Sequence, residues 1–153
     1  MGPSRNPAGI LLADDDAEDR EMTRKALEKN CLASEFHAVE DGEELLDYLN
    51  HRGKYAPPAE SPTPGLILLD LNMPKMDGRE ALAAIKSDPL LRRIPVVVMT
   101  TSKAQEDIFR TYDLGCSSFI SKPISFESLE EVTMVLGKYW FQIVTLPDAK
   151  SGR

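Results

Sequence analysis

The sequence lacks any apolar run of about 18 residues, the length at which a transmembrane helix becomes a candidate. Residues 1–6 also lack the apolar core of a signal peptide, and neither Ser nor Thr stands at the position that N-myristoylation favours. These absences argue against secretion, a membrane span and a lipid anchor. We therefore expect a cytoplasmic protein with no membrane partner.

Histidine and cysteine are equally scarce. The two histidines, His37 and His51, form no cluster, and the two cysteines, Cys31 and Cys116, lie far apart without a CxxC spacing. This pattern gives no support to a zinc site. In a cytoplasmic chain it favours two reduced core thiols over a disulfide, although the sequence leaves both states open. No GxxxxGK and no GxSxG motif occurs, so nucleotide hydrolysis and serine-hydrolase chemistry also lack support.

Positive charge is in short supply as well. The 153 residues carry 18 Lys and Arg against 25 Asp and Glu, which gives a formal net charge of -7. Phosphate backbones repel such a chain, so we expect no nucleic-acid partner. A hydrophobic content of 42% in a chain of this length is typical of one globular domain.

The chain does contain short apolar runs, four of which are followed directly by a carboxylate, hydroxyl or ammonium side chain. These runs and the residues that follow them are 10–13 with Asp14 and Asp15, 66–69 with Asp70, 96–99 with Thr100, and 119–121 with Lys122. Continuous apolar runs are typical of buried parallel strands. Because ligands of open α/β sheets bind at the carboxyl ends of the strands, we expect these polar groups to share one crevice.

Helix-like stretches alternate with the strand-like runs, which indicates five βα units with right-handed crossovers. The expected helices cover about 17–30, a segment after Asp41-Gly42 with Leu45, Leu46 and Leu49 in the core, 78–87, 103–114, and a segment that begins after Ser125. The second strand, at about 35–39, is weak. Four prolines and two glycines between 51 and 65 predict a long surface loop without evident chemistry.

Three consecutive aspartates leave the register of the acidic pair open by one residue. Asp16 is the expected cap of the first helix, with Asp19 three residues later in a relation like that of a capping box. This structural role for Asp16 leaves Asp14 and Asp15 for the crevice.

Two or three carboxylates in one crevice repel one another, each pair by about 1 to 4 kcal/mol at about 4 Å. A hard divalent cation such as Mg2+ offsets that repulsion and neutralises charge on a transferred phosphoryl group. Asp70 is the candidate nucleophile, because carboxylates accept phosphoryl groups as aspartyl phosphates. Lys122 and Thr100 supply an ammonium and a hydroxyl for the phosphoryl oxygens.

Together these motifs resemble the receiver domain of two-component response regulators, over about residues 9–136. The matching segments are Asp14-Asp15, Asp70-Leu71-Asn72-Met73-Pro74 with Met76-Asp77-Gly78, Thr100-Thr101-Ser102, and Phe119 ahead of Lys122-Pro123. The resemblance implies a flavodoxin-like (βα)5 fold, a doubly wound five-stranded parallel sheet in the order 2-1-3-4-5. It also implies Mg2+-dependent transfer of a phosphoryl group from a sensor histidine kinase to Asp70, later reversed by hydrolysis.

The resemblance also implies roles for individual residues. Asp15 and Asp70 would bind the metal through their side chains, Asn72 through its backbone carbonyl, and Asp14 mostly through water.

Phosphoryl binding and switching would fall to a second group of residues. Thr100, Lys122 and the backbone N–H of Thr101 would hold the phosphoryl oxygens. Thr100 would move inward on phosphorylation, and Phe119, which stands where the family more often has Tyr, would rotate into the vacated space. The surface of the fourth helix, fifth strand and fifth helix would change as a result.

We expect a stand-alone receiver domain at 9–140, with a short extension at 1–8 and another at 141–153. The last helix has an apolar stripe, and Met134 and Phe141 fall outside it, on a second patch that suits either an interface or an extension of the core. The tail resembles that of single-domain response regulators paired with phytochromes, several of which form homodimers. This likeness implies a phytochrome-type kinase as partner and residues 141–153 as a possible dimer contact.

Three alternatives are weaker. A haloacid-dehalogenase-type phosphatase needs a second acid two residues after its nucleophile, where this chain has Asn72. An EF-hand would need an oxygen ligand where Pro74 stands. A receiver-like module that has lost phosphotransfer is disfavoured by the complete set of acids, hydroxyl and lysine. We therefore expect a signalling protein and not an enzyme that acts on an external substrate.

Overall fold

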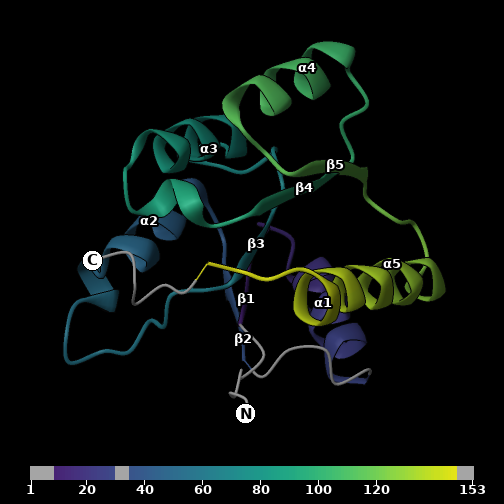
Figure 1. Cartoon of the computed structure of the whole chain (residues 1–153), viewed down its shortest axis with the longest axis horizontal. Helices are drawn as coiled ribbons and strands as arrows, with labels where there is room; N and C mark the ends of the chain where they lie inside the picture. The colour runs from purple at the N-terminus through teal and green to yellow at the C-terminus, as the bar shows by residue number, and fades with distance from the viewer. Residues whose placement is uncertain (1–8, 30–34, 148–153) are drawn as a thin grey trace.

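A computed structural model describes residues 9–29 and 35–147 of the chain. Within them, five parallel strands form one sheet in the order β2-β1-β3-β4-β5 (Figure 1). The strands are β1 (Ile10–Ala13), β2 (Phe36–Val39), β3 (Leu66–Leu69), β4 (Val96–Thr100) and β5 (Ser118–Ser121). The expected doubly wound parallel sheet and its strand order are confirmed.

Helices cover both faces of the sheet. They are α1 (Ala17–Lys29), α2 (Gly42–Asn50), α3 (Gly78–Ser87), α4 (Gln105–Leu114) and α5 (Phe126–Lys138), with short 3-10 turns η1 (Gly53–Tyr55) and η2 (Leu91–Arg93). In Figure 1, α1 and α5 lie together on one side, and α2, α3 and α4 lie on the other. This two-sided cover explains why the three central strands are buried throughout and apolar at every position except Thr100 at the end of β4.

Successive residues of β1 show how the sheet divides the core. Leu11 and Ala13 belong to the apolar cluster beneath α2 and α3, whereas Ile10 and Leu12 belong to the cluster beneath α1 and α5. All four side chains are at most 3% exposed. Because neighbouring side chains of a strand point to opposite faces, a continuous apolar run fills two cores at once.

Side chains fix most helix starts. The Asp41 carboxylate accepts from the backbone N–H of Glu44 at the start of α2, and Asp77 and Glu80 form a reciprocal capping box at the start of α3. α4 begins at Gln105, two residues later than predicted, because the preceding segment is held by side-chain contacts of Ser102. The predicted end of the first helix at residue 30 lies outside the described residues.

Only one of the two cysteines lies among the residues that the structure describes. Cys116 is a free thiol, 7% exposed, whose pKa is raised by burial. Cys31 lies outside the described residues.

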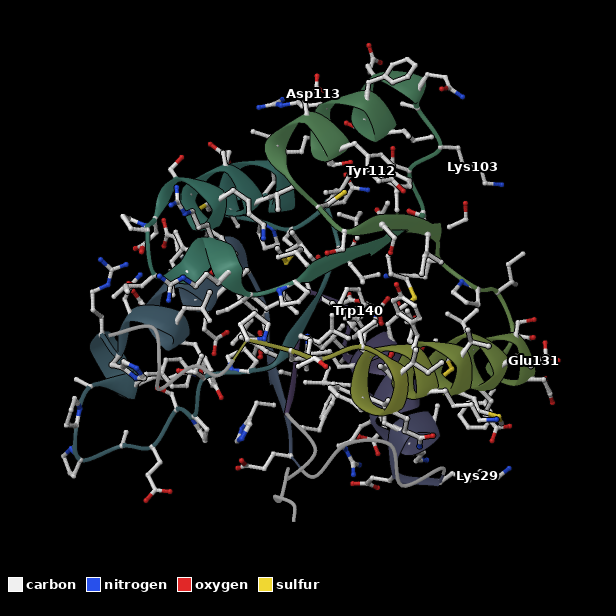
Figure 2. All side chains as sticks on the ribbon, in the orientation of Figure 1. Lys29, Lys103, Tyr112, Asp113, Glu131 and Trp140 are labelled. Atoms are coloured by element: carbon white, nitrogen blue, oxygen red, sulfur yellow. The ribbon has the colours of Figure 1, made fainter. Side chains whose placement is uncertain are left out.

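The C-terminal segment departs from the predicted helical stripe. After α5 the chain forms a π-helical turn, η3 (Tyr139–Ile143). Phe141, which we expected on a separate patch, packs against the same core cluster as Trp140, because the wider i→i+5 turn changes the direction of the following side chains. Figure 2 shows Trp140 beside the sheet and Glu131 on the outer side of α5. Met134 is 37% exposed and lies outside the stripe as expected.

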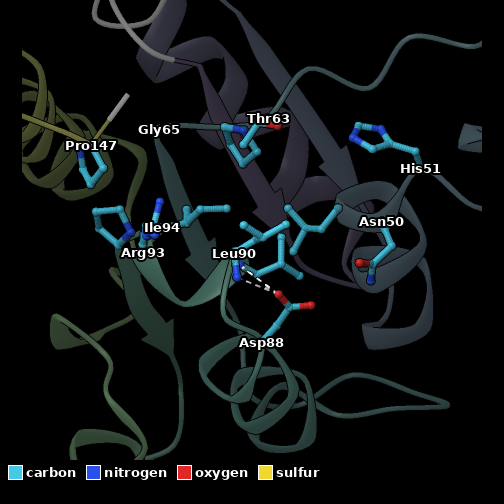
Figure 3. A pocket seen from close by; sticks show the side chains of 13 residues that line it. Asn50, His51, Thr63, Gly65, Asp88, Leu90, Arg93, Ile94 and Pro147 are labelled. Carbon is cyan, nitrogen blue, oxygen red and sulfur yellow. Dashed lines mark hydrogen bonds between the residues drawn. The ribbon is translucent and has the colours of Figure 1, made fainter. Parts of the chain in front are cut away.

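The loop at 51–65 is ordered by polar contacts. The Tyr48 hydroxyl donates to the carbonyl of Pro62 at 2.8 Å, and His51 Nδ1 lies 2.7 Å from Ser61 Oγ. The loop borders a cavity of about 470 Å³ with Leu49, Leu91 and Ile94 in its apolar wall (Figure 3). Because Gly65 and Pro95 line it just before β3 and β4 begin, this cavity lies at the opposite end of the sheet from the crevice.

Across residues 9–29 and 35–147, no helix combines the length and the apolar character that crossing a bilayer requires.

Two glycines hold the segment after β3. The N–H of Gly42 donates to the carbonyl of Met76 at 2.8 Å, and the N–H of Gly78 donates to the carbonyl of Leu71 at 2.9 Å. A Cβ atom at Gly78 would lie 2.3 Å from the carbonyl oxygen of Asp70, and one at Gly42 would lie 2.3 Å from that of Met76. Only glycine permits these approaches, because both neighbours are backbone atoms.

Gly78→Ala should therefore lower the free energy of unfolding by about 2 kcal/mol, the usual cost of forcing an atom into a packed site. Urea denaturation measures the loss. Gly9→Ala is the control, because its Cβ would meet its nearest atom at 3.3 Å and should cost less. Equal stability of Gly78→Ala and the wild type would contradict the tight approach.

Candidate functional site

The carboxyl ends of four strands meet at one edge of the sheet. Ala13 of β1 is paired with Leu69 of β3, and Thr100 of β4 is paired with Ser121 of β5. Asp14, Asp70 and Lys122 each follow one of these strands directly, so they arrive at the same level as Thr100. The predicted crevice is present.

Lys122 is the centre of charge in the crevice. Its ammonium Nζ lies 2.9 Å from Asp14 Oδ2, 2.9 Å from Asp19 Oδ2 and 3.1 Å from Asp70 Oδ2. Burial would lower the pKa of this ammonium, but the hydrogen bonds to Asp14 and Asp19 outweigh burial and hold the pKa above its usual value. Lys122 is therefore a permanent positive charge shared by three carboxylates.

Asp14 is the most buried of the acids, at 2% exposure. Burial raises the pKa of its carboxyl, and the backbone N–H of Asp16, which donates to Oδ1 at 2.9 Å, opposes that rise. The guanidinium of Arg20 donates to the backbone carbonyl of Asp14 at 2.8 Å, which fixes the chain at this point.

The register of the three aspartates is as predicted. Asp16 caps α1, since its Oδ1 accepts from the N–H groups of Glu18 and Asp19 at 2.9 and 3.2 Å. Asp14 and Asp15 remain in the crevice.

A divalent cation fits the acids of the crevice. Asp14, Asp15 and Asp70 each offer one oxygen, and these oxygens lie within 4.8 Å of one another. Asp15 is exposed and Asp14 and Asp70 are buried, so the group opens to solvent on one side. All the donors are hard carboxylate oxygens, the type that Mg2+ and Mn2+ prefer over zinc. When bound, such an ion would neutralise negative charge at the oxygens of Asp70 and of a phosphoryl group.

Asp70 Oδ1 faces two donors. The hydroxyl of Thr100 donates to it at 2.8 Å, and the backbone N–H of Asn72 donates at 3.2 Å. Thr100 is fully buried, so its hydroxyl already lies inward, against the carboxylate. A donor at this place lies within reach of any group that Asp70 carries.

The other predicted residues lie nearby. Thr101 is exposed and directly follows Thr100. Phe119 is half-buried and packs against the core cluster beneath α2 and α3, and its backbone N–H donates to the Tyr112 hydroxyl of α4 at 3.2 Å. The position of Phe119 thus links β5 to α4.

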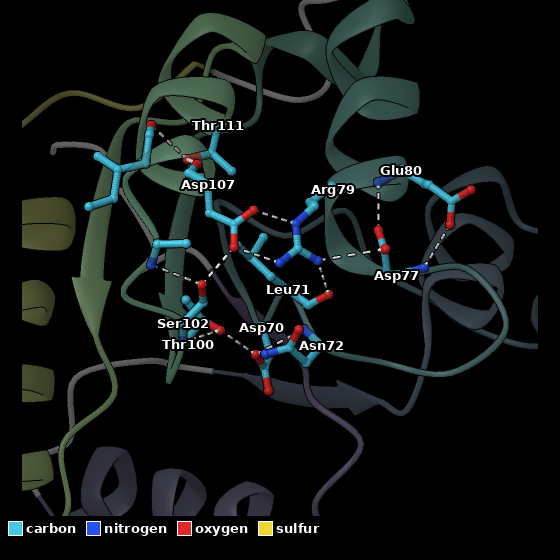
Figure 4. A network of polar contacts seen from close by, with 12 residues as sticks. Asp70, Leu71, Asn72, Asp77, Arg79, Glu80, Thr100, Ser102, Asp107 and Thr111 are labelled. Carbon is cyan, nitrogen blue, oxygen red and sulfur yellow. Dashed lines mark hydrogen bonds and ion pairs between the residues drawn. The ribbon is translucent and has the colours of Figure 1, made fainter.

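Sequence reasoning missed two parts of the site. Asp19, expected only near the helix cap, turns its carboxylate to Lys122. Its place in the first turn of the helix after the acidic pair was the available signal. Arg79 and Asp107 form a bidentate ion pair next to Asp70 (Figure 4). They lie 28 residues apart, and no local pattern connects them.

Comparison with known proteins points to one family. The model of the response regulator receiver domain matches residues 10–134. Response regulator Rcp1 of Synechocystis sp. is 38% identical over 146 residues, which cover 95% of this chain and 97% of Rcp1.

Solved structures agree with this match. The phosphorylated cyanobacterial phytochrome response regulator RcpA has a TM-score of 0.85 and 42% identity, covering 93% of this chain and 99% of RcpA. The Mn2+-bound form of Rcp1 has a TM-score of 0.84 and 38% identity, covering 93% of this chain and 100% of Rcp1. A divalent ion is thus recorded in a similar fold.

Lys122→Met keeps an unbranched side chain of similar length but removes the ammonium that Asp14 and Asp70 share. We expect a loss of about 3 kcal/mol of unfolding free energy in EDTA, because removing one partner of a buried ion pair leaves the other charge uncompensated. Mg2+ should recover most of this loss, since a ligand that binds only the folded state stabilises it. Urea denaturation in EDTA and in Mg2+ measures both effects.

Lys29→Met provides the matched control. It removes the pair between the exposed Lys29 of α1 and Glu130 of α5 and should change little in either buffer, because the ammonium stays in water. If Lys122→Met lost the same stability in EDTA and in Mg2+, the ammonium and the cation would not serve the same carboxylates.

Proposed function

Because the chain belongs to the response regulator receiver family of two-component systems, we propose that Asp70 accepts a phosphoryl group from a sensor histidine kinase in a Mg2+-dependent reaction. The observation that supports this most directly is the convergence of Lys122, Thr100 and the three-acid group on the Asp70 carboxylate.

The proposed reaction is a transfer between two side chains. An oxygen of Asp70 forms a bond to phosphorus while the bond between phosphorus and the kinase histidine nitrogen breaks, and the imidazole keeps the electron pair. Water later attacks the aspartyl phosphate, releases inorganic phosphate and restores the carboxylate. The protein is consumed as a substrate in the first step, so we do not regard it as an enzyme for an external substrate.

Metal binding is assigned to four residues. Asp15 and Asp70 bind Mg2+ through their carboxylates, Asn72 through its backbone carbonyl and Asp14 mostly through water. The three-acid group supports this assignment, and Asn72 lies next to Asp70 as the role requires.

The phosphoryl oxygens are assigned to the ammonium of Lys122, the hydroxyl of Thr100 and the backbone N–H of Thr101. Lys122 is a suitable partner because it holds Asp70 at 3.1 Å and is 14% exposed, so its flexible side chain reaches an added group without leaving the crevice. Its contacts with Asp14 and Asp19 would weaken as the phosphoryl oxygens compete for the ammonium.

Output is assigned to the α4-β5-α5 surface, with Thr100 and Phe119 as the switch. This surface already has exposed apolar side chains, among them Phe109 and Tyr112 on α4 and Ile124 after β5. A phosphoryl group adds about two negative charges and three acceptor oxygens at Asp70, which pulls on the Thr100 hydroxyl and through it on the start of α4.

We assign the kinase to the phytochrome type. Rcp1 and RcpA support this assignment, since RcpA is described as a phytochrome response regulator and both align with nearly the whole chain.

Two further parts complete the proposal: the protein forms a homodimer through α5 and residues 141–153, and it is located in the cytoplasm. Exposed Val135, Tyr139 and Ile143 suit the dimer contact.

Acetyl phosphate with Mg2+ should add the mass of one phosphoryl group to the wild type and none to Asp70→Asn. Asp47→Asn on α2, which changes an exposed acid, should react like the wild type. Intact-mass spectrometry measures the modification, and sedimentation of the same samples measures the dimer. Equal modification of Asp70→Asn would remove Asp70 from the proposed role, and a monomer under all conditions would remove the dimer.

Kinase choice needs a competition experiment. With equal amounts of a phytochrome kinase and an unrelated histidine kinase, we expect phosphotransfer from the phytochrome kinase to be at least about tenfold faster, a difference of about 1.4 kcal/mol at the transition state. Phosphotransfer is followed with radiolabelled kinase. Equal rates from both kinases would contradict the phytochrome assignment and leave the phosphorylation of Asp70 intact.

A further inference from the structure

A polar network connects the segment after Asp70 with the segment after Thr100 (Figure 4). Its centre is Arg79, in the first turn of α3, whose Nε and Nη2 donate to the two carboxylate oxygens of Asp107 on α4 at 2.6 and 2.7 Å. Both side chains are mostly buried, at 19% and 13% exposure. Planar bidentate pairs of this kind fix orientation as well as distance.

On one side the network reaches the candidate nucleophile. Arg79 Nη1 donates to the backbone carbonyl of Leu71 at 3.4 Å, and Leu71 is the residue directly after Asp70. The same carbonyl accepts from the N–H of Gly78 at 2.9 Å. The guanidinium therefore lies against a short, tightly held piece of backbone.

On the other side the network reaches the candidate phosphoryl-binding segment. The Ser102 hydroxyl donates to Asp107 Oδ2 at 2.6 Å, and the Ser102 N–H donates to Thr100 Oγ1 at 3.4 Å. Thr100 Oγ1 in turn donates to Asp70 Oδ1 at 2.8 Å. The contacts form a closed ring from Asp70 through both segments and back.

Charge strengthens the centre of this ring. The hydrogen bonds from Arg79 and Ser102 lower the pKa of the Asp107 carboxyl to about 2, so this carboxylate stays ionised wherever the protein is folded at ordinary pH. Among the described residues, the side chains of Thr101 and Lys103 make no hydrogen bond or ion pair. Ser102 is thus the side-chain anchor of the segment between β4 and α4.

We propose that Arg79 and Asp107 are positioning residues that hold the Thr100 hydroxyl and the Thr101 N–H at a set distance from Asp70. They touch neither the metal ligands nor the phosphoryl group, and they act through Ser102 and the Leu71 carbonyl. The pair thereby sets how fast Asp70 accepts a phosphoryl group. This role depends on the proposed phosphorylation of Asp70.

A simple brace between α3 and α4 would also use an Arg–Asp pair, but its effect would be confined to stability. The positioning role predicts a change in rate, because displacement of a reacting group by about 1 Å costs up to about a hundredfold. The two roles therefore separate in kinetics measured on folded protein.

The test uses the full chain with acetyl phosphate as donor. Arg79→Gln and Asp107→Asn should each lower the maximal rate of phosphorylation about tenfold and leave the Mg2+ concentration for half-maximal rate unchanged. The slowing in the double variant should be clearly smaller than the product of the two single effects, because both substitutions remove the Arg79–Asp107 contact. Arg79→Lys should recover only part of the rate, since an ammonium cannot reproduce the two-point contact.

Lys29→Gln is the control for loss of one positive charge and one ion pair between helices, and it should match the wild type. Wild-type rates in Arg79→Gln, equal slowing in Lys29→Gln, or additive slowing in the double variant would each overturn the positioning role. Asp70→Asn in the same assay tests the proposed function separately. Modification that persists in that variant overturns the proposed function, and its loss there with unchanged rates in Arg79→Gln overturns the positioning role alone.

Discussion

Repulsion among carboxylates is the constraint around which this molecule is built. β1 and β3 are neighbours in the sheet, and each ends in an acid, so Asp14 and Asp70 meet in a place where water cannot screen them well. Lys122 arrives from the far side of β4 and places one ammonium between them. The strand order therefore brings the two acids together at buried strand ends. It also brings Lys122 to the same place, where its ammonium balances their charge.

Much of this arrangement could be predicted because burial leaves a strong trace in sequence. The runs at 10–13, 66–69 and 96–99 are apolar at every position because both of their faces are covered, and the residues after them had to share an edge. The remainder depends on tertiary contacts. From the sequence, Asp19 is a typical residue of a helix start, and only the folded chain places it beside Lys122. No local pattern connects Arg79 with Asp107. The π turn that brings Phe141 into the core has no recognisable signal in the sequence.

The two ends of the sheet have different characters. The carboxyl end holds charged groups in close contact, whereas the amino end has a cavity of about 470 Å³ with a largely apolar wall and is bordered by the loop at 51–65. This cavity and the charged crevice are thus separated by the length of the strands. Asp70 is surrounded by close contacts between side chains and not by an enclosed chamber, which suits the proposed reaction with a side chain of another protein.

The close backbone contacts of Gly42 and Gly78 also make the two sides of Asp70 different. The chain from Leu71 to Met76 is clamped at one end by Gly78 and at the other by Gly42, with backbone touching backbone. The opposite wall is the end of β4, beyond which the Ser102 hydroxyl donates to Asp107 of α4. A group added to Asp70 would therefore face backbone-to-backbone contacts on the side of α2 and α3, and side-chain contacts on the side of α4. Because side chains change rotamer more easily than touching backbone atoms can separate, we expect any such movement to be taken up mainly on the α4 side.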